Sequence, residues 1–369
     1  MKVYGTGMGI LEGRCKPEIE LLLKKFRDTN GSAFDPWDSI YPAVCNVMIL
    51  LLLGKRLSHS HPDFQKVLEI NKLFNQLFSP GESLELDYRP WASLHNTQSQ
   101  ERLHSALRLR DKFFQEQIVP LQAADCSADD CILKSLLEYT DLATDSDVDI
   151  TNDTVKEVFT NLLLAGTDTT ATALACLLLI LLHYPDVQDS LHKEMDHVLS
   201  ERCLPTLSDK QRMPYLDAVL MELCRFISHV PLAVPHSTTR DTEVCGYPVR
   251  ANTTVYINLW SLHHSESYWK DPWQFIPERF LNSSGKLISP DHPNRRRLMA
   301  FSAGRRVCLG ETLAKNRMFL FAASILQKFR FKPEVDSALP DMDPRGFDFG
   351  LVLHPKRFRL RAVPRETET

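Results

Sequence analysis

One ten-residue stretch, FSAGRRVCLG at positions 301–310, places a single cysteine just before a predicted helix. Gly304 and Gly310 let the backbone pass close to a flat or bulky ligand. A cysteine at a helix N-terminus faces unpaired backbone N–H groups and the positive end of the helix dipole, which favour the thiolate. Cys308 is therefore a candidate nucleophile or metal ligand. The alternative is a buried structural cysteine beside a helix start.

A second unusual stretch is AGTDTT at positions 165–170, inside an apolar helical pattern that follows Thr151 and stops at Pro185. A helix of about 30 residues is about 45 Å long, so it must cross the middle of a domain. Buried polar groups without partners cost about 1–3 kcal/mol each. A kink or bulge that opens space against a ligand would explain them. The alternative is that the threonine and aspartate side chains bond to the carbonyls of their own helix.

A third candidate is a set of charged residues in two separate motifs. Glu222 and Arg225 in ELCR are three residues apart, on one face of a predicted helix. Alone, such a pair is usually a solvated ion pair worth under about 1 kcal/mol. It becomes structural if Arg279 of PERF, at positions 277–280, closes a buried triad.

Together these segments closely resemble the cytochrome P-450 superfamily of haem-thiolate monooxygenases. The chain carries F-x-x-G-x-R-x-C-x-G, A-G-x-D-T-T, E-x-x-R and P-E-R-F in the family's order and spacing, and the resemblance covers nearly the whole chain. The stretches PHSTTRD at 235–241 and INLWSLHH at 257–264 are similar to animal microsomal members, among them the steroid 17-alpha-hydroxylases and the xenobiotic-metabolising families. The resemblance implies a lipophilic substrate, such as a steroid or a xenobiotic.

The resemblance implies a role for each matched residue. Cys308 would be the axial thiolate ligand of the iron in haem b and would push electron density that favours O–O cleavage. Thr169 and Asp168 would lie on the distal side and help deliver protons to oxygen. Arg306 and His236 match positions that contact the haem propionates, and arginine suits a carboxylate. His236 has an alternative role as a loop-packing residue.

The other matched residues have supporting roles. The triad of Glu222, Arg225 and Arg279 would be structural and not catalytic. The resemblance places five further residues at the haem: Phe301, Gly304, Gly310, Ala165 and Gly166. Two residues would line the substrate pocket: Val234 and Leu351.

The resemblance also implies partners and a location. Electrons from NADPH would reach the haem through NADPH–cytochrome reductase, with cytochrome b5 as a second donor, at the cytoplasmic face of the endoplasmic reticulum membrane. A basic cluster would dock the acidic reductase, and a solvated surface is an equal alternative. The cluster consists of Arg295, Arg296, Arg297 and Arg305.

Composition agrees with an ordinary folded protein and excludes other classes. Lys and Arg total 43 and Asp and Glu 47, so the net charge of −4 gives no support for nucleic-acid binding. The nine cysteines among 369 residues are odd in number and irregularly spaced, which indicates a reducing compartment and no disulfide framework. Cys126 and Cys131 have no matching pair for a zinc site. No apolar run reaches the length of about 18 residues that a membrane helix needs.

The sequence departs from the family at its start. Family members carry an N-terminal membrane anchor and a helix with W-x-x-x-R, and none of the five tryptophans here is followed by arginine four residues on. We therefore expect one N-terminally truncated cytochrome P-450 domain over 1–369 that lacks the anchor, first strands and first helices. Residues 1–150 would form the helical substrate-roof side, and 151–369 the haem-binding core. The alternative is a catalytically inactive fragment that only binds or has no function.

Periodicity predicts a mainly α fold with a small β portion late in the chain. The predicted helices span 17–27, 42–53, 62–78, 95–119, 131–139, 151–183, 185–200, 214–226 and a last stretch from just after Cys308 to 328, and the predicted strands lie at 243–245, at 253–257 and within 329–360.

Overall fold

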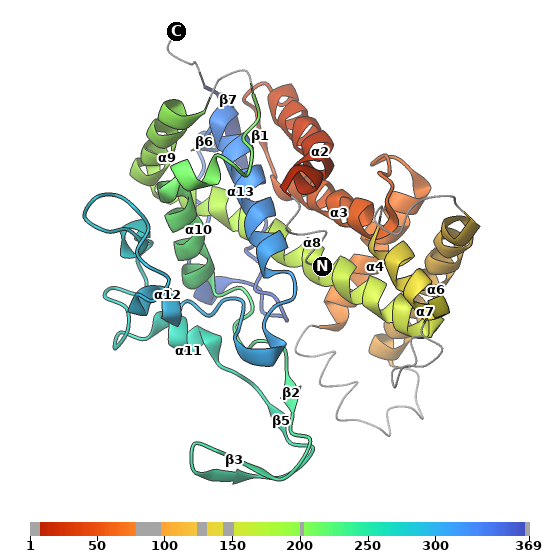
Figure 1. The fold of residues 1–369 in the computed structure, drawn as a ribbon. Coiled ribbons are helices and arrows are strands. Elements are labelled where there is room, and N and C mark those ends of the chain that lie inside the picture. Colours follow the sequence, from red (N-terminus) through yellow and green to blue (C-terminus); the bar gives the residue numbers. More distant parts are fainter. Residues whose placement is uncertain (1–7, 79–96, 124–130, 143–150, 200–202, 366–369) are drawn as a thin grey trace.

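The structure is a computed structural model that describes residues 8–78, 97–123, 131–142, 151–199 and 203–365. The fold is mainly α with a small β portion, as predicted (Figure 1). Its helices are α2 (Met8–Asp28), α3 (Trp37–Leu53), α4 (Pro62–Leu77), α6 (Gln98–Ala123), α7 (Ile132–Leu142), α8 (Asn152–His183), α9 (Pro185–Val198), α10 (Pro214–Ile227), α11 (Leu259–His264), α12 (Pro293–Arg297) and α13 (Glu311–Lys328).

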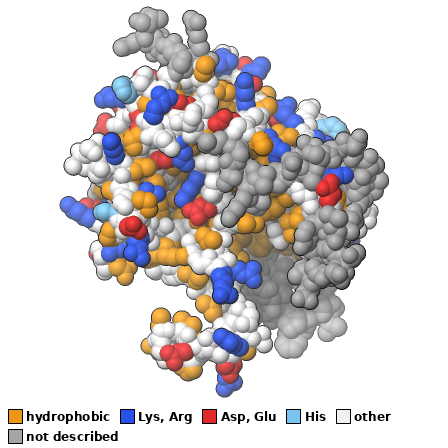
Figure 2. Space-filling model, viewed as in Figure 1, with side chains coloured by type: hydrophobic (Ala, Val, Ile, Leu, Met, Phe, Trp, Pro, Cys, Tyr) orange, Lys and Arg blue, Asp and Glu red, His pale blue; other side chains and the backbone are white. Residues whose placement is uncertain are grey.

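The β portion consists of three small antiparallel sheets among the described residues. The largest has the order β1-β7-β6 and joins the two ends of the chain, because Phe34 pairs with Leu360. The β3–β4 hairpin projects from the body of the molecule and exposes Val244 and Tyr247 (Figures 1 and 2). The strands are β1 (Ala33–Phe34), β2 (His236–Ser237), β3 (Thr242–Val244), β4 (Tyr247–Val249), β5 (Thr254–Val255), β6 (Phe329–Pro333) and β7 (Leu360–Pro364).

Helix α8 is the central element of the fold, and its predicted length is confirmed at 32 residues. Thr151 caps it, because its side chain accepts a hydrogen bond from the backbone N–H of Thr154 at 3.2 Å. The helix packs against α3 on one side and against α10 and α13 on others. It is long and apolar enough to cross a membrane, but 83% of its most apolar 18-residue window is buried inside the protein. That burial is what a core helix requires.

Three predicted helix boundaries are wrong at prolines. Helix α3 begins at Trp37 and contains Pro42, which we expected at its start. Helix α2 begins at Met8 and contains Pro17, which we expected at its start. The turns before Pro17 stay helical because Leu11 and Cys15, both fully buried, extend the apolar stripe at a spacing of four residues. Tertiary packing thus offsets the local cost of proline. Helix α6 likewise continues past Pro120 to Ala123.

A single hydrophobic cluster runs through most of the molecule. It contains buried residues from Leu11 near the start of the described chain to Ala362 near its end, and it includes side chains of α2, α3, α8, α10 and α13. This cluster joins α8, α10 and α13, and a second, smaller cluster of Ala218, Trp269, Phe280 and Ile288 contains the phenylalanine of PERF.

Candidate active site

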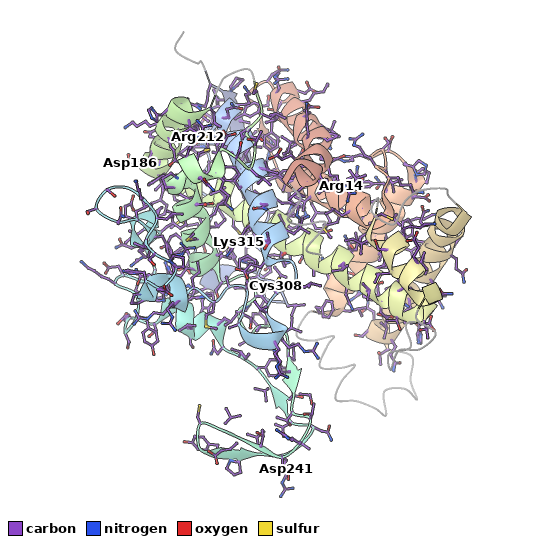
Figure 3. The ribbon with its side chains drawn as sticks, in the orientation of Figure 1. Arg14, Asp186, Arg212, Asp241, Cys308 and Lys315 are labelled. Atoms are coloured by element: carbon purple, nitrogen blue, oxygen red, sulfur yellow. The ribbon has the colours of Figure 1, made fainter. Side chains whose placement is uncertain are left out.

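The cysteine loop is a tight turn between a short 3₁₀ helix and α13. Gly304 has φ +78°, a conformation that glycine adopts without strain. The backbone N–H of Cys308 donates to the carbonyl of Phe301 at 2.9 Å, and Gly310 forms the N-cap of α13. The loop therefore fixes Cys308 at the N-terminal end of α13 (Figure 3), where the sequence predicted it.

The thiol of Cys308 is exposed on the open side of this loop. Protein atoms packed behind the sulfur nevertheless raise its pKa, and the backbone N–H of Gly310 lowers it by a smaller amount. The net direction is opposite to the one we expected from the helix N-terminus. Burial thus favours the thiol form of Cys308, and a cation bound at the sulfur would favour the thiolate.

The surroundings of Cys308 are open and apolar. Val307 and Leu309 are 42% and 70% exposed, and a Cβ atom built on Gly304 or Gly310 would meet nothing within 4 Å. Phe301 is partly buried, with the ammonium of Lys315 on α13 5.1 Å from its ring centroid. A face of this kind has space for a flat apolar group.

The AGTDTT segment is an uninterrupted part of α8, so the predicted break or bulge is wrong. The alternative, bonding back to the helix, holds for Thr169, whose hydroxyl donates to the carbonyl of Ala165 at 2.7 Å. Ala165 is exposed and Thr169 partly exposed, whereas Asp168 is buried. The alcohol and the acid thus lie on different sides of one helix.

Gly166 is explained by packing between helices. A Cβ atom at this position would lie 2.6 Å from the sulfur of Met48 on α3, so any larger residue requires the Met48 side chain to move. The Gly166 carbonyl accepts a hydrogen bond from Nη2 of Arg317 at 2.5 Å, and the same nitrogen donates to Thr170. Gly166 therefore has a packing role on the α3 side, and its predicted contact with haem stays a prediction.

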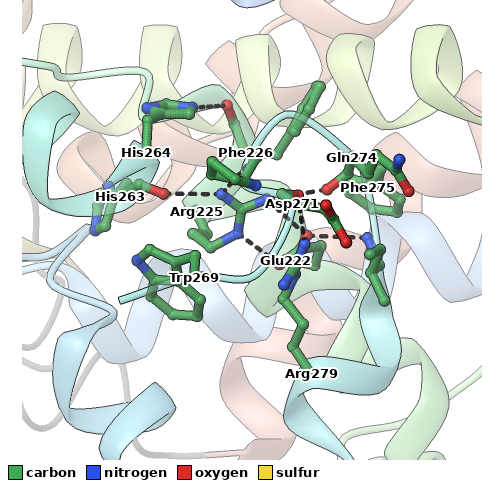
Figure 4. A network of polar contacts seen from close by, with 12 residues as sticks. Glu222, Arg225, Phe226, His263, His264, Trp269, Asp271, Gln274, Phe275 and Arg279 are labelled. Atoms are coloured by element: carbon green, nitrogen blue, oxygen red, sulfur yellow. Dashed lines mark hydrogen bonds and ion pairs between the residues drawn. The ribbon is translucent and has the colours of Figure 1, made fainter. Parts of the chain in front are cut away.

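The structure brings Glu222, Arg225 and Arg279 together in one buried ionic triad (Figure 4). Arg225 donates to both oxygens of Glu222, at 2.7 and 2.8 Å. Arg279 donates to Glu222 Oε1 at 3.2 Å. The remaining donors of Arg225 bond to the carbonyls of three residues: His263, Pro272 and Gln274. The triad therefore ties α10 to the segment that follows α11.

The other residues that we predicted to contact haem or substrate lie in separate segments of the fold. His236 is partly buried in β2, opposite Val255 of β5, and Arg306 is exposed in the 3₁₀ helix of the cysteine loop. No hydrogen bond or ion pair engages either side chain within the described part of the chain. Val234 is 62% exposed, and Leu351 is partly buried.

Part of the basic cluster is engaged inside the molecule. Nη1 of Arg295 donates to the carbonyl of Ile288 at 3.1 Å, and the guanidinium of Arg297 lies 4.9 Å from the Tyr268 ring centroid. Cys126 lies outside the described residues. Among the residues that are described, no group of three or more His, Cys, Asp or Glu side chains could hold a metal ion.

Sequence reasoning missed two residues that contact the AGTDTT segment. Arg317 on α13 is fully buried and bonds to Gly166 and Thr170. His354, near the C-terminus, lies 3.1 Å from Asp168. Neither has a fixed spacing from its partner, so only the fold brings them together.

Comparison with known proteins identifies the family. A family model described as Cytochrome P450 matches residues 4–362. Cytochrome P450 2E1 of Mesocricetus auratus is 34% identical over 376 residues, which cover 99% of this chain and 73% of that protein. Cytochrome P450 1A1 of Sparus aurata is 32% identical over 369 residues, covering 96% and 68%. With the cysteine loop at the start of α13 and the long central helix, these matches show that the chain belongs to the cytochrome P450 family of haem-thiolate monooxygenases.

Proposed function

We propose that this chain oxidises a lipophilic small molecule, such as a steroid or a xenobiotic, with electrons from an NADPH-dependent reductase at the endoplasmic reticulum membrane. The observation that carries the proposal is the cysteine loop, which presents one exposed thiol beside open apolar surface. When bound, the haem supplies the reductive activation of dioxygen and the transfer of one oxygen atom. The residues of the chain supply the binding site, its orientation and the protons.

The residues around Cys308 fit a haem. Open space at Gly304 and Gly310 admits a flat ring, and exposed Val307 and Leu309 supply apolar surface for it. Cys308 would hold the iron as a thiolate, since a bound cation favours the deprotonated sulfur. The guanidinium of Arg306 has no partner among the described residues, so it can donate charge-assisted hydrogen bonds to a propionate. We assign the same role to His236.

The distal groups are Thr169 and Asp168. Because the Thr169 hydroxyl donates to Ala165, its lone pairs remain free to accept a hydrogen bond from water or from a second donor. Asp168 holds its carboxylate on the buried side of α8. We assign to Thr169 the positioning of a proton at the pocket and to Asp168 the supply of that proton.

The test of haem-thiolate binding is spectroscopic. We expect protein that is expressed with haem supplied to give, after reduction and addition of carbon monoxide, the Soret band typical of thiolate ligation. Cys308→Ala should abolish this band. Cys245→Ala is the matched control, because Cys245 is also exposed but lies in the β3–β4 turn. Failure of the native chain to bind haem would refute the proposal and favour the inactive fragment.

The substrate class and the electron donor need separate measurements. A screen of steroids, fatty acids and drugs should find compounds that shift the haem spin state. With NADPH and its reductase, the best of these should gain one atom of ¹⁸O from labelled dioxygen. Steady binding without label in the product would contradict monooxygenation. Cytochrome b5 is tested by adding it to the same assay.

The role of Thr169 has its own test. We expect Thr169→Ala to keep haem but to release more hydrogen peroxide for each product formed, because a pocket that lacks the hydroxyl loses a positioned proton. Thr160→Ala is a control on the same helix, since Thr160 bonds to its own backbone at Lys156. Unchanged coupling of oxygen use to product in Thr169→Ala would remove Thr169 from the mechanism.

A further inference from the structure

One histidine from the C-terminal segment reaches the acidic residue of α8. Nε2 of His354 lies 3.1 Å from Oδ2 of Asp168. On the other side of its ring, Nδ1 is 3.3 Å from the hydroxyl oxygen of Thr172. Asp168 and Thr172 are one helical turn apart, so both polar side chains of this face engage the same imidazole.

The position of His354 is fixed from several directions. Its backbone forms a pair of hydrogen bonds with Asp348, of 2.8 and 3.0 Å, and the neighbouring N–H of Leu353 donates to the carbonyl of His229 at 2.8 Å. The ring packs edge-on against Trp37 of α3, with centroids 5.6 Å apart and planes at 81°. A ring held by backbone and aromatic contacts can in turn hold its partner.

Burial differs between the two members of the pair. The Asp168 side chain is 7% exposed and that of His354 is 30% exposed. His354 also lines a cavity of about 230 Å³, together with Asp35 and Trp37. Oδ1 of Asp168 is buried and has no hydrogen-bond partner among the described residues. A buried carboxylate needs compensation, and His354 supplies it on the side that faces solvent.

The other charged groups around His354 are few. From the segment after α10 comes His229, whose pKa burial lowers to about 4, so this ring is neutral at neutral pH. Asp348 faces His354 across their backbone pair, and the cavity is lined by Asp35, Lys356 and Arg357. Arg357 is paired with Asp35 and Asp38. Among the described residues, Asp168 is thus the carboxylate that directly contacts the ring.

We propose that His354 is a positioning residue for Asp168: it holds Oδ2 toward the solvent-facing cavity and leaves Oδ1 free inside the protein. The proposal rests on the proposed function, in which Asp168 supplies protons. Nε2–H donates to Oδ2, and Nδ1 accepts from the Thr172 hydroxyl. Removal of the ring leaves the buried carboxylate without its donor, and the distal acid loses its fixed orientation.

The contact itself is tested without reference to catalysis. Two-bond ¹H–¹⁵N spectra of protein with ¹⁵N-labelled histidine rings report which nitrogen carries the proton. The His354 signal is assigned by its loss in His354→Gln. We expect the Nε2–H form, with a ¹⁵N shift that moves in Asp168→Leu and in Thr172→Val. An Nδ1–H form, or a signal that neither substitution moves, overturns the proposal.

The functional role is tested by a conservative rescue. We expect His354→Leu to retain haem but to lower the fraction of consumed oxygen that appears in product by about tenfold, the effect of losing a hydrogen bond to a charged group. His354→Gln should restore most of that fraction, because its amide N–H can still donate to Oδ2. His183→Gln, in the last turn of the same helix, is the control and should change little.

The outcomes separate the two claims. Normal coupling in His354→Leu, or a His354→Gln variant as impaired as His354→Leu, overturns the positioning role while the monooxygenase stands. A chain that binds no haem refutes the proposed function, and the ring spectra still decide whether His354 holds Asp168.

Discussion

Two buried arginines, Arg225 on α10 and Arg317 on α13, have opposite surroundings. Both side chains are almost fully buried, at 0% and 1% exposed. Arg225 meets a carboxylate and three carbonyls. Arg317 bonds through one nitrogen only, and its Nε and Nη1 have no partner among the described residues. The first cation is fully compensated, whereas the second is not.

Within the part of the chain that the structure describes, no anion near Arg317 compensates its charge. Burial raises the pKa of the neighbouring Cys15 and Cys45 thiols to about 12, so both are neutral. Burial also lowers the pKa of Arg317 to about 10, a direction that marks the cost of its charge. A compensated buried charge fixes geometry, whereas an uncompensated one lowers the net stability of the fold.

The largest effect should follow from removing the anion of the compensated site. Glu222→Ala leaves Arg225 and Arg279 buried without their carboxylate, and we expect it to lower the free energy of unfolding by about 3–5 kcal/mol. Urea denaturation measures the loss. Glu243→Ala, at an exposed position of β3, should change it by less than about 0.5 kcal/mol. Equal losses in the two variants would mean that the carboxylate of Glu222 stabilises the fold no more than an exposed glutamate does.

The second largest effect should be a fall in the free energy of unfolding in acid, caused by His263 beside Arg225. His263, whose carbonyl binds Arg225, is buried, and burial lowers its pKa to about 3. Its Nε2 accepts from the N–H of Met299, which requires the neutral ring. The unfolded histidine titrates near 6.5, so between pH 6.5 and 3 the unfolded state binds more protons and stability falls as pH falls. We expect this histidine to contribute a slope of about 1.4 kcal/mol per pH unit.

The measurement is urea denaturation between pH 7 and pH 5. His263→Gln should be less stable at pH 7 but should show a shallower dependence on pH, because a titrating group is lost. His192 and His229, whose pKa values burial lowers to about 4, keep their part of the slope. An identical slope in the native chain and the variant would contradict a neutral buried His263.

The smallest effect should come from the uncompensated site. Arg317→Met removes a buried cation that has no carboxylate partner among the residues described. Replacement of such groups by apolar residues of similar size is often neutral or stabilising. We expect the free energy of unfolding to change by about 1 kcal/mol or less, despite the full burial of the side chain. A loss as large as that of Glu222→Ala would show that Arg317 has an anionic partner. The difference between the surroundings of Arg225 and Arg317 would then not hold.

The sequence predicted the features that rest on short spacing. The E-x-x-R spacing places Glu222 and Arg225 on one helix face, and the apolar pattern of α8 predicted its extent to within one residue. Cys308 was found for the same reason, since glycines and a helix start surround it locally. Patterns within about one helical turn or one loop are readable because the chain itself fixes their geometry.

The sequence could not predict features that depend on packing between distant segments. Pro17, Pro42 and Pro120 suggested helix ends, but each lies inside a helix. Buried side chains hold α2 through Pro17, so tertiary contacts outweigh local propensity there. Gly166 looked like a break in α8 and is instead the contact with Met48. His354 gave no signal at all, because nothing near it in the chain indicates a carboxylate.

The contact between Thr172 and His354 also has a consequence for synthesis of the protein. Since 182 residues separate them, a ribosome that adds about 5–20 residues per second needs about 10–40 s to supply the histidine after the helix is made. During that time Asp168 and Thr172 on α8 lack their contacts with the imidazole of His354. The contact of α8 with His354 therefore forms only after the cysteine loop has been synthesised. A chain that stops before residue 354 would keep Cys308 but lack the side chain that we propose to position Asp168.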